Sequence, residues 1–169
     1  WLQAITCNGN THSLLSANAN RLKLFLDSFD LVYHPSLTTD ILLDDLLKKE
    51  EEIDFLLVEG AITSNKEFFQ ISDQTTSEVL KKLVLKSKYG GVHKKFEQNS
   101  DIFGLEEALD KKDISSLVHP IVNLTGCPVH PEWILQTLFS LKEYKQMPLD
   151  EKGRPKESYS HLAHHGCTR

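Results

Sequence analysis

Leu124-Thr-Gly-Cys-Pro-Val-His-Pro-Glu-Trp133 is the stretch that decides the type of fold, because a strand gives way to a helix within it. The apolar run 120–124 predicts a buried strand, and residues 132–144 have the spacing of an amphipathic helix. Pro131 stands just ahead of that helix, where proline favours a helix start. Cys127 therefore lies in the loop at the carboxyl end of a strand, which is where α/β proteins bind ligands.

The first ten residues, Trp1-Leu-Gln-Ala-Ile-Thr-Cys-Asn-Gly-Asn10, have the same order of features. Residues 1–6 predict a buried strand, Cys7 follows its end, and Thr11 is a candidate N-cap for the next helix. Parallel strands bring their carboxyl ends to one edge of a sheet. We therefore expect the sulfur atoms of Cys7 and Cys127 to lie close together.

Further strands and helices alternate along the rest of the chain. Strands are predicted at 30–34 and 54–58, and helices at 41–52, 76–88 and 101–111. This alternation predicts an α/β protein with a flavodoxin-like, doubly wound parallel sheet and helices on both faces.

The composition divides the chain into two parts. Residues 1–144 contain the predicted strands and helices and form the flavodoxin-like domain, whereas residues 145–169 are polar, broken by Gly and Pro, and predict an extended tail. Within the domain, Gly90-Gly91 directly follows the helix that is predicted to end near Lys88, where a doubly wound fold needs an apolar strand. We expect residues to be missing at this junction, because loss of an interior strand would expose its neighbours.

The amino-acid composition excludes several classes of protein. With 169 residues, 40% hydrophobic and 25% charged, the chain is a globular domain long enough to bury a core. A formal net charge of -5 without a basic stripe argues against nucleic acid as a partner. Charged residues interrupt every apolar run before the roughly 18 residues of a membrane span, so no direct span is predicted. Three cysteines cannot all pair, which leaves buried thiols, one disulfide or metal ligands as alternatives.

Six short motifs in this order resemble the small subunit of the nickel-iron hydrogenases over nearly the whole chain. Taken singly, each motif is also compatible with a turn, a buried thiol or a frayed chain end. The motifs are Trp1-Leu-Gln with Cys7-x-Gly9, Val58-Glu-Gly-Ala-Ile62, Gly90-Gly91, Gly126-Cys-Pro128 with Pro131-Glu-Trp133, Gly153-Arg-Pro-Lys156 and His164-x-x-Cys167.

The resemblance implies a subunit that carries iron-sulfur clusters and no catalytic residue. Cys7 and Cys127 would be ligands of the proximal 4Fe-4S cluster, and His164 and Cys167 would be ligands of the distal one. The chain would pass electrons between a hydrogenase-type large subunit and an acceptor, and alone it would be inactive. The large subunit would bind the face around Cys7, Glu59 and Cys127. A membrane-bound acceptor would be reached through other subunits, on the cytoplasmic or the periplasmic side of a membrane-associated complex.

The chain departs from this family at the ligand positions. Asn10 stands where the family has a second cysteine, and no cysteine precedes Gly90-Gly91, where the third belongs. Iron-sulfur clusters take soft thiolates, whereas a carboxamide is a hard, neutral ligand. His12 stands where the family has a glutamate that resembles a proton-relay group, and histidine also titrates near neutral pH. The 4Fe-4S cluster is accordingly retained in an altered form, or lost.

Two functions remain open on these residues. The first is an electron-transferring iron-sulfur small subunit, which Cys127 and His164-x-x-Cys167 favour. The second is a cluster-poor scaffold or interaction protein that keeps the fold without electron transfer, which Asn10 and His12 favour. A flavin carrier is disfavoured, because no Ser/Thr/Gly-rich phosphate loop follows the first strand.

Overall fold

A computed structural model describes residues 1–48, 53–90, 102–109, 114, 120–143 and 147–160 of the chain. Two parallel strand pairs lie at the centre of the molecule. Strand β1 (Leu2–Gln3) pairs with β3 (Val58–Glu59), and β2 (Ile53–Leu56) pairs with β7 (Ser87–Gly90). Leu57 alone separates β2 from β3, so one extended run of chain contributes to both pairs.

The other two strand pairs are antiparallel. Strand β4 (Ile62–Thr63) pairs with β8 (Ile102–Phe103). Strands β5 (Gln70–Ile71) and β6 (Gln74–Thr75) form a hairpin, whose turn residues Ser72 and Asp73 both have positive φ, 49° and 61°. Positive φ at both turn positions matches the twist of two-residue hairpins.

Residues near its N-terminus determine where each of the helices predicted at 76–88 and 132–144 begins. Thr75 and Glu78 form a capping box ahead of α4, in which each side chain accepts from the other residue's backbone N–H. Pro131 occupies the first turn of α7, and the His130 side chain accepts from Glu132 N. The helices are α1 (Gly9–Leu15), α2 (Ala19–Ser28), α3 (Leu43–Lys48), α4 (Thr76–Val84), α5 (Leu105–Ala108), α7 (Pro131–Lys142) and α8 (Lys156–Tyr159).

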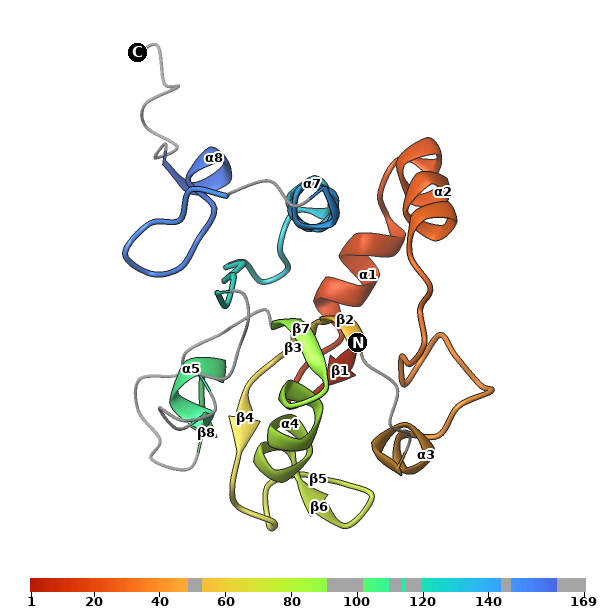
Figure 1. The fold of residues 1–169 in the computed structure, drawn as a ribbon, viewed down its shortest axis with the longest axis vertical. Coiled ribbons are helices and arrows are strands. Elements are labelled where there is room, and N and C mark those ends of the chain that lie inside the picture. The colour runs from red at the N-terminus through yellow and green to blue at the C-terminus, as the bar shows by residue number, and fades with distance from the viewer. Residues whose placement is uncertain (49–52, 91–101, 110–113, 115–119, 144–146, 161–169) are drawn as a thin grey trace.

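Two hydrophobic clusters hold these elements together. Helices α1, α2, α7 and α8 lie towards one end of the molecule, and α4 with the β5–β6 hairpin lies at the other (Figure 1). The first cluster joins α4 to the strands and includes Leu2, Val58, Ile62, Leu80 and Leu83. The second cluster joins α1, α2 and α7 and includes Leu14, Phe25, Val129, Leu135 and Leu138.

The predicted fold class is confirmed at the level of a mixed α/β protein, and several predicted elements are wrong in detail. The helix predicted over 101–111 contains strand β8, and α5 is limited to Leu105–Ala108. Residues 30–34 and 120–124 form no strand. The helix predicted over 76–88 ends at Val84, and β7 follows it directly. A strand therefore does occupy the junction before Gly91; its sequence, Ser-Lys-Tyr-Gly, is not apolar, and its pairing with β2 identifies it.

Residues 147–160 of the predicted tail fold back onto the domain. A turn around Gly153 brings Leu149 and Pro155 into an isolated bridge, and the Gly153 carbonyl accepts from Asn123 N at 2.8 Å. Gly153 has φ +68°, and a Cβ built on it would lie 3.0 Å from Asn123 Nδ2. This position therefore requires glycine for both its backbone conformation and its close contact. In the described part of the chain, no helix has the length and apolarity to span a membrane.

Candidate functional site

A buried carboxylate organises the beginning of α1. Glu59, at the end of β3, is 1% exposed and accepts backbone N–H groups from Asn10 at 2.9 Å and Thr11 at 3.3 Å. It also accepts side-chain hydrogen bonds from Trp1 Nε1 at 3.2 Å, Thr6 Oγ1 at 3.3 Å and Thr11 Oγ1 at 2.6 Å. The α1 N-terminus is thus capped by a residue 48 and 49 positions away from the two N–H groups that it binds, rather than by its own N-cap, Asn8, whose side chain makes no cap bond.

The hydrogen-bond chain continues from Glu59 to a buried histidine. The single Thr11 hydroxyl proton is donated to Glu59, so the 3.2 Å contact between Thr11 Oγ1 and His34 Nε2 requires His34 to donate. His34 Nδ1 accepts from Ser36 N at 3.1 Å. The ring is therefore neutral with its proton on Nε2, and burial lowers the pKa of His34.

The two cysteine-bearing loops meet at Gly9. Cys7 and Cys127 are both exposed, and neither forms a disulfide. A Cβ built on Gly9 would lie 3.3 Å from Cys7 Sγ and 3.7 Å from Pro128 Cβ, so there is little room for a larger residue between the loops. The two loops therefore adjoin, although the segment before Cys127 is not the strand that we expected. The closeness of the two sulfur atoms stays a prediction.

Side chains of α1 also bind the loop that carries Cys127. Asn10 Oδ1 accepts from Val129 N at 2.8 Å, and Ser13 Oγ donates to Val129 O at 2.5 Å. His12, on the same helix, is exposed and takes no part in the Glu59–Thr11–His34 chain. The buried polar chain was not found from sequence, because its members are single Thr, His and Glu residues without a common motif.

The described residues do not fit a four-iron cluster. Cys7 and Cys127 supply two thiolates, and no group of three or more His, Cys, Asp or Glu residues within the described ranges is arranged to hold a metal ion. The Asn10 carboxamide oxygen accepts from Val129 N, and a carboxamide is a hard ligand where iron-sulfur clusters take thiolates. His164 and Cys167 lie outside the described residues.

The folded-back tail clamps the backbone just before Cys127. Tyr159 OH donates to Thr125 O and accepts from Thr125 N, each at 2.9 Å. Its ring packs edge-on against Trp133 with centroids 4.9 Å apart, and burial raises the pKa of Tyr159. Asn123 Nδ2 donates to Lys152 O at 2.7 Å. The roles of Tyr159 and Asn123 could not be predicted from the sequence, since hydrogen bonds to distant backbone groups leave no local pattern.

The predicted partner surface is wrong at Glu59, which is buried. We expected the large subunit to contact a face around Cys7, Glu59 and Cys127, but Glu59 is enclosed by its own donors and only the two cysteine loops are exposed. The Glu59 carboxylate therefore stabilises the interior of the chain and is not available to a partner.

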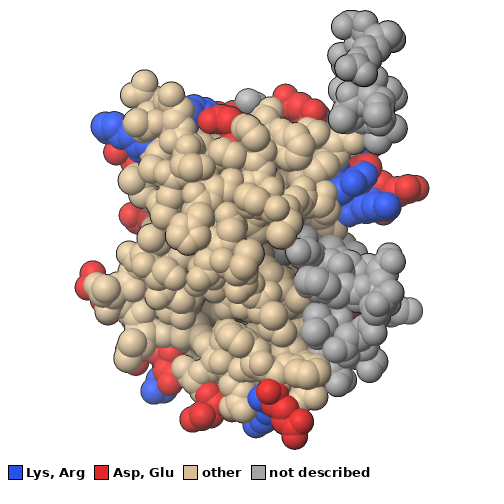
Figure 2. All heavy atoms as spheres, turned by 180° about the vertical axis from the view of Figure 1, so that it is seen from behind, with Lys and Arg blue, Asp and Glu red and all other residues tan. Residues whose placement is uncertain are grey.

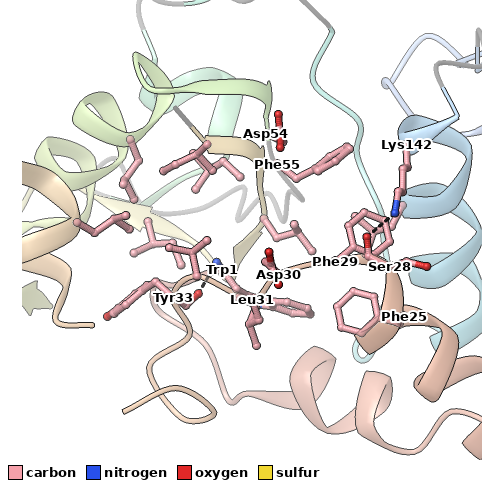
Figure 3. Close-up of a pocket in the computed structure, with 18 residues that line it drawn as sticks. Trp1, Phe25, Ser28, Phe29, Asp30, Leu31, Tyr33, Asp54, Phe55 and Lys142 are labelled. Carbon is pink, nitrogen blue, oxygen red and sulfur yellow. Dashed lines mark hydrogen bonds between the residues drawn. The ribbon is translucent and has the colours of Figure 1, made fainter. Parts of the chain in front are cut away.

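A separate pocket of about 540 Å³ lies between α2, β2 and α7 (Figure 3). Aromatic rings line much of it, among them Phe25, Phe29 and Phe55, with Asp30 at one side. Lys142 Nζ donates to Ser28 O at its edge and lies over the Phe29 ring. Neither cysteine lines this pocket.

Comparison with known proteins identifies the class. Residues 7–141 match the family described as NADH ubiquinone oxidoreductase, 20 Kd subunit, and the chain belongs to this family. Its relatives are small subunits of NiFe and NiFeSe hydrogenases, so the resemblance drawn from the sequence motifs is confirmed.

Individual relatives are distant but similar over their alignable length. The periplasmic [NiFeSe] hydrogenase small subunit of Desulfomicrobium baculatum is 27% identical over 99% of this chain and 64% of its own length. The F420 non-reducing hydrogenase I small subunit of Methanosarcina mazei is 30% identical over 100% of this chain and 56% of its own. This chain thus spans 56–64% of these curated relatives. A crystal structure of the reduced, active Ni-Fe-Se hydrogenase from Desulfomicrobium baculatum superposes with a TM-score of 0.80 and 27% identity, covering 99% of this chain and 72% of the other.

Proposed function

We propose that this chain is a cluster-poor hydrogenase-type small subunit that binds a hydrogenase-type large subunit at the edge where its two cysteine loops meet. The observation that carries the proposal is the α1 edge itself. There Gly9, Asn10 and Ser13 join the two loops through protein contacts, while the thiolates that the described residues supply are fewer than four.

One face of the molecule has few charged side chains in its middle (Figure 2). On the face shown in Figure 2, charged side chains lie mainly around the margin and the middle is formed by uncharged residues. The fully buried centres of protein interfaces are depleted of charge in the same way. A large subunit that covers this kind of surface would desolvate few charges.

Co-purification with the large subunit tests the proposal. His12 is exposed on α1 beside the Cys7 loop, so His12→Asp would place a carboxylate in the proposed interface. We expect large-subunit recovery to fall several-fold, whereas Glu67→Lys in the exposed loop before β5 should leave it unchanged. Equal recovery with both variants would move the interface elsewhere. No recovery with the unaltered chain would end the subunit proposal.

Electron transfer is the second candidate, because Cys7 and Cys127 are exposed on adjoining loops of one edge. In that case the chain would hold a degenerate iron-sulfur cluster, with His164 and Cys167 serving a distal site, and would pass electrons to an acceptor that other subunits connect to the membrane. Iron and sulfide analysis of anaerobically reconstituted protein separates the candidates. Stoichiometric iron and sulfide that are lost in Cys7→Ser would favour electron transfer.

We also propose that residues 1–144 form a flavodoxin-like, doubly wound domain, with residues 145–169 as a separate segment. The parallel pairs β1–β3 and β2–β7 support it, since a doubly wound sheet is built from such pairs. An experimental structure of the complex with the large subunit would test this division.

A further inference from the structure

We propose that Asn10 and Ser13 form a latch on Val129 that holds the two cysteine loops together in the absence of a metal cluster. The latch deepens the proposed cluster-poor function, and it concerns the isolated chain rather than its partner. It consists of the hydrogen bonds from Val129 N to Asn10 Oδ1 and from Ser13 Oγ to Val129 O.

The two latch residues bind the two backbone groups of a single residue, Val129. Positions 10 and 13 are three residues apart, so their side chains lie on one face of α1. One supplies an acceptor for the Val129 N–H and the other a donor for the Val129 C=O. Val129 is 1% exposed, so water cannot readily replace either bond, and buried backbone groups are costly to leave unpaired.

The backbone N–H of Asn10 also forms a hydrogen bond, which fixes the position of the residue. Its N–H donates to Glu59 Oε1 at 2.9 Å, and Glu59 is fixed by further donors from Trp1 and Thr11. The residue is thus anchored to the β3 end on one side and to the Cys127 loop on the other. A ligand role for position 10 would require its side chain to release Val129, which leaves a buried N–H without its acceptor.

With the latch, the closed arrangement of the two loops does not require a bound metal. In a domain closed by a metal site, ligand loops come together only when the metal binds, so metal removal unfolds the site. Here the α1 edge and the Cys127 loop are joined by hydrogen bonds, the Gly9 contact and the apolar packing of Leu14 with Val129. The closed arrangement should therefore persist in iron-free protein.

Amide hydrogen exchange at Val129 tests the latch directly. The full chain is purified with chelator, and the exchange rate of the Val129 N–H, which is buried and donates to Asn10, is measured by NMR. Asn10→Ala removes the acceptor, and we expect about tenfold faster exchange at Val129 with a lower melting temperature. Asn10→Asp keeps an acceptor oxygen and should restore the slow rate. His12→Ala, a change on the exposed side of α1, should have no effect.

Two results would overturn the latch. One is an unchanged rate and melting temperature in both Asn10→Ala and Ser13→Ala. The other is a melting temperature of the unaltered chain that rises in proportion to bound iron, because a cluster would then close the loops. If Asn10→Ala does not fold, Ser13→Ala, which keeps the Asn10 bond, supplies the intermediate rate that the latch requires. Large-subunit recovery is measured separately, so the latch and the partner proposal fail independently.

Discussion

Glu59 receives hydrogen bonds from the first residue, the Cys7 loop and α1, and these donors converge on its two oxygens. At the scale of single residues, its carboxylate explains why α1 begins where it does. Backbone N–H groups at a helix start lack partners within the helix, and an anion there is also favoured by the helix dipole. The same carboxylate orders Thr11, and through Thr11 it selects the tautomer of His34.

Replacing Glu59 with glutamine tests this role. Glu59→Gln keeps the shape but leaves one acceptor oxygen and an NH₂ group that faces the donors of Trp1 or Thr11. We expect a loss of about 2–3 kcal/mol in the free energy of unfolding, measured by urea titration. The exposed Glu67→Gln is the matched control and should change the midpoint little. Equal midpoints for the two variants would contradict a structural role for the buried carboxylate.

The pH dependence of stability follows from His34. Burial places the pKa of His34 in the folded state below its ordinary value of 6.5, so the unfolded chain binds the proton more readily. This contribution to stability is complete above about pH 6.5 and is lost as the pH falls from there through the folded-state pKa, with a limiting slope of about 1.4 kcal/mol per pH unit. His34→Asn should flatten the urea-unfolding profile in this window. A wild-type profile with the opposite slope there, absent in His34→Asn, would contradict the assignment.

At the scale of elements, the segment from 147 to 160 acts on the Cys127 loop from the opposite side to α1. Tyr159 holds both backbone groups of Thr125, two residues before Cys127, and Asn123 holds the Gly153 turn. The loop is thus fixed before and after its cysteine by different parts of the chain. Asn123 Oδ1 is buried, and the described residues provide it with no hydrogen-bond partner.

Removing the Tyr159 hydroxyl should loosen the tail selectively. Tyr159→Phe keeps the packing on Trp133 but loses both bonds to Thr125, which is exposed and can turn to water. We therefore expect a modest loss of about 1 kcal/mol in unfolding free energy and faster amide hydrogen exchange at 123–125 and 153–156. Exchange in α4 should stay unchanged. Uniform acceleration across α4 as well would indicate global destabilisation instead of a local clamp.

Elements with strong local signals were predictable, and those defined by distant contacts were not. The start of α7 follows from Pro131 and the extended run 54–58 from its apolar residues, so both appear close to their predicted places. Residues 120–124 are as apolar as a strand, yet Asn123 bonds to the tail instead of to a neighbouring strand. The Cys7 and Cys127 loops adjoin, but residues 120–124 form no strand, so the shared edge of a sheet is not the reason; hydrogen bonds from Asn10 and Ser13 to Val129 join the loops instead. The burial of Glu59 was not predictable, since its donors are Trp1, Thr6 and the first turn of α1, all of them 48 or more residues earlier in the chain.

At the scale of the whole molecule, the two hydrophobic clusters stabilise different parts of the fold. The first supports α4 and the strands, and the second supports the edge that carries both cysteine loops. Leu135 is fully buried in the second cluster, on the same helix whose first turn follows the Cys127 loop. Packing in this cluster should therefore govern the cysteine edge more than packing under α4.

A cavity in the second cluster measures this dependence. Leu135→Ala should lower the free energy of unfolding by about 2–5 kcal/mol and also speed amide hydrogen exchange at Val129, which belongs to the same cluster. Leu24→Ala, at a position 47% exposed on α2, is the control and should alter neither quantity appreciably. Leu80→Ala in the first cluster should lower stability with a smaller effect on exchange at Val129 below the unfolding transition. Equal effects of Leu135→Ala and Leu80→Ala on exchange at Val129 would show that the clusters act as one unit.

The bond between Asn10 and Val129 also sets an order of events during biosynthesis. These residues are 119 positions apart, so most of the chain must leave the ribosome before the bond can form. Contacts over such separations form late, because closing a long loop costs entropy first. Strands β1 and β3 can pair earlier, whereas Leu14 and Phe25 cannot be buried until α7 is available to pack against them. The nascent chain therefore exposes an apolar surface on α1 and α2 until residues 129–138 are made, which is the interval in which a chaperone would engage it.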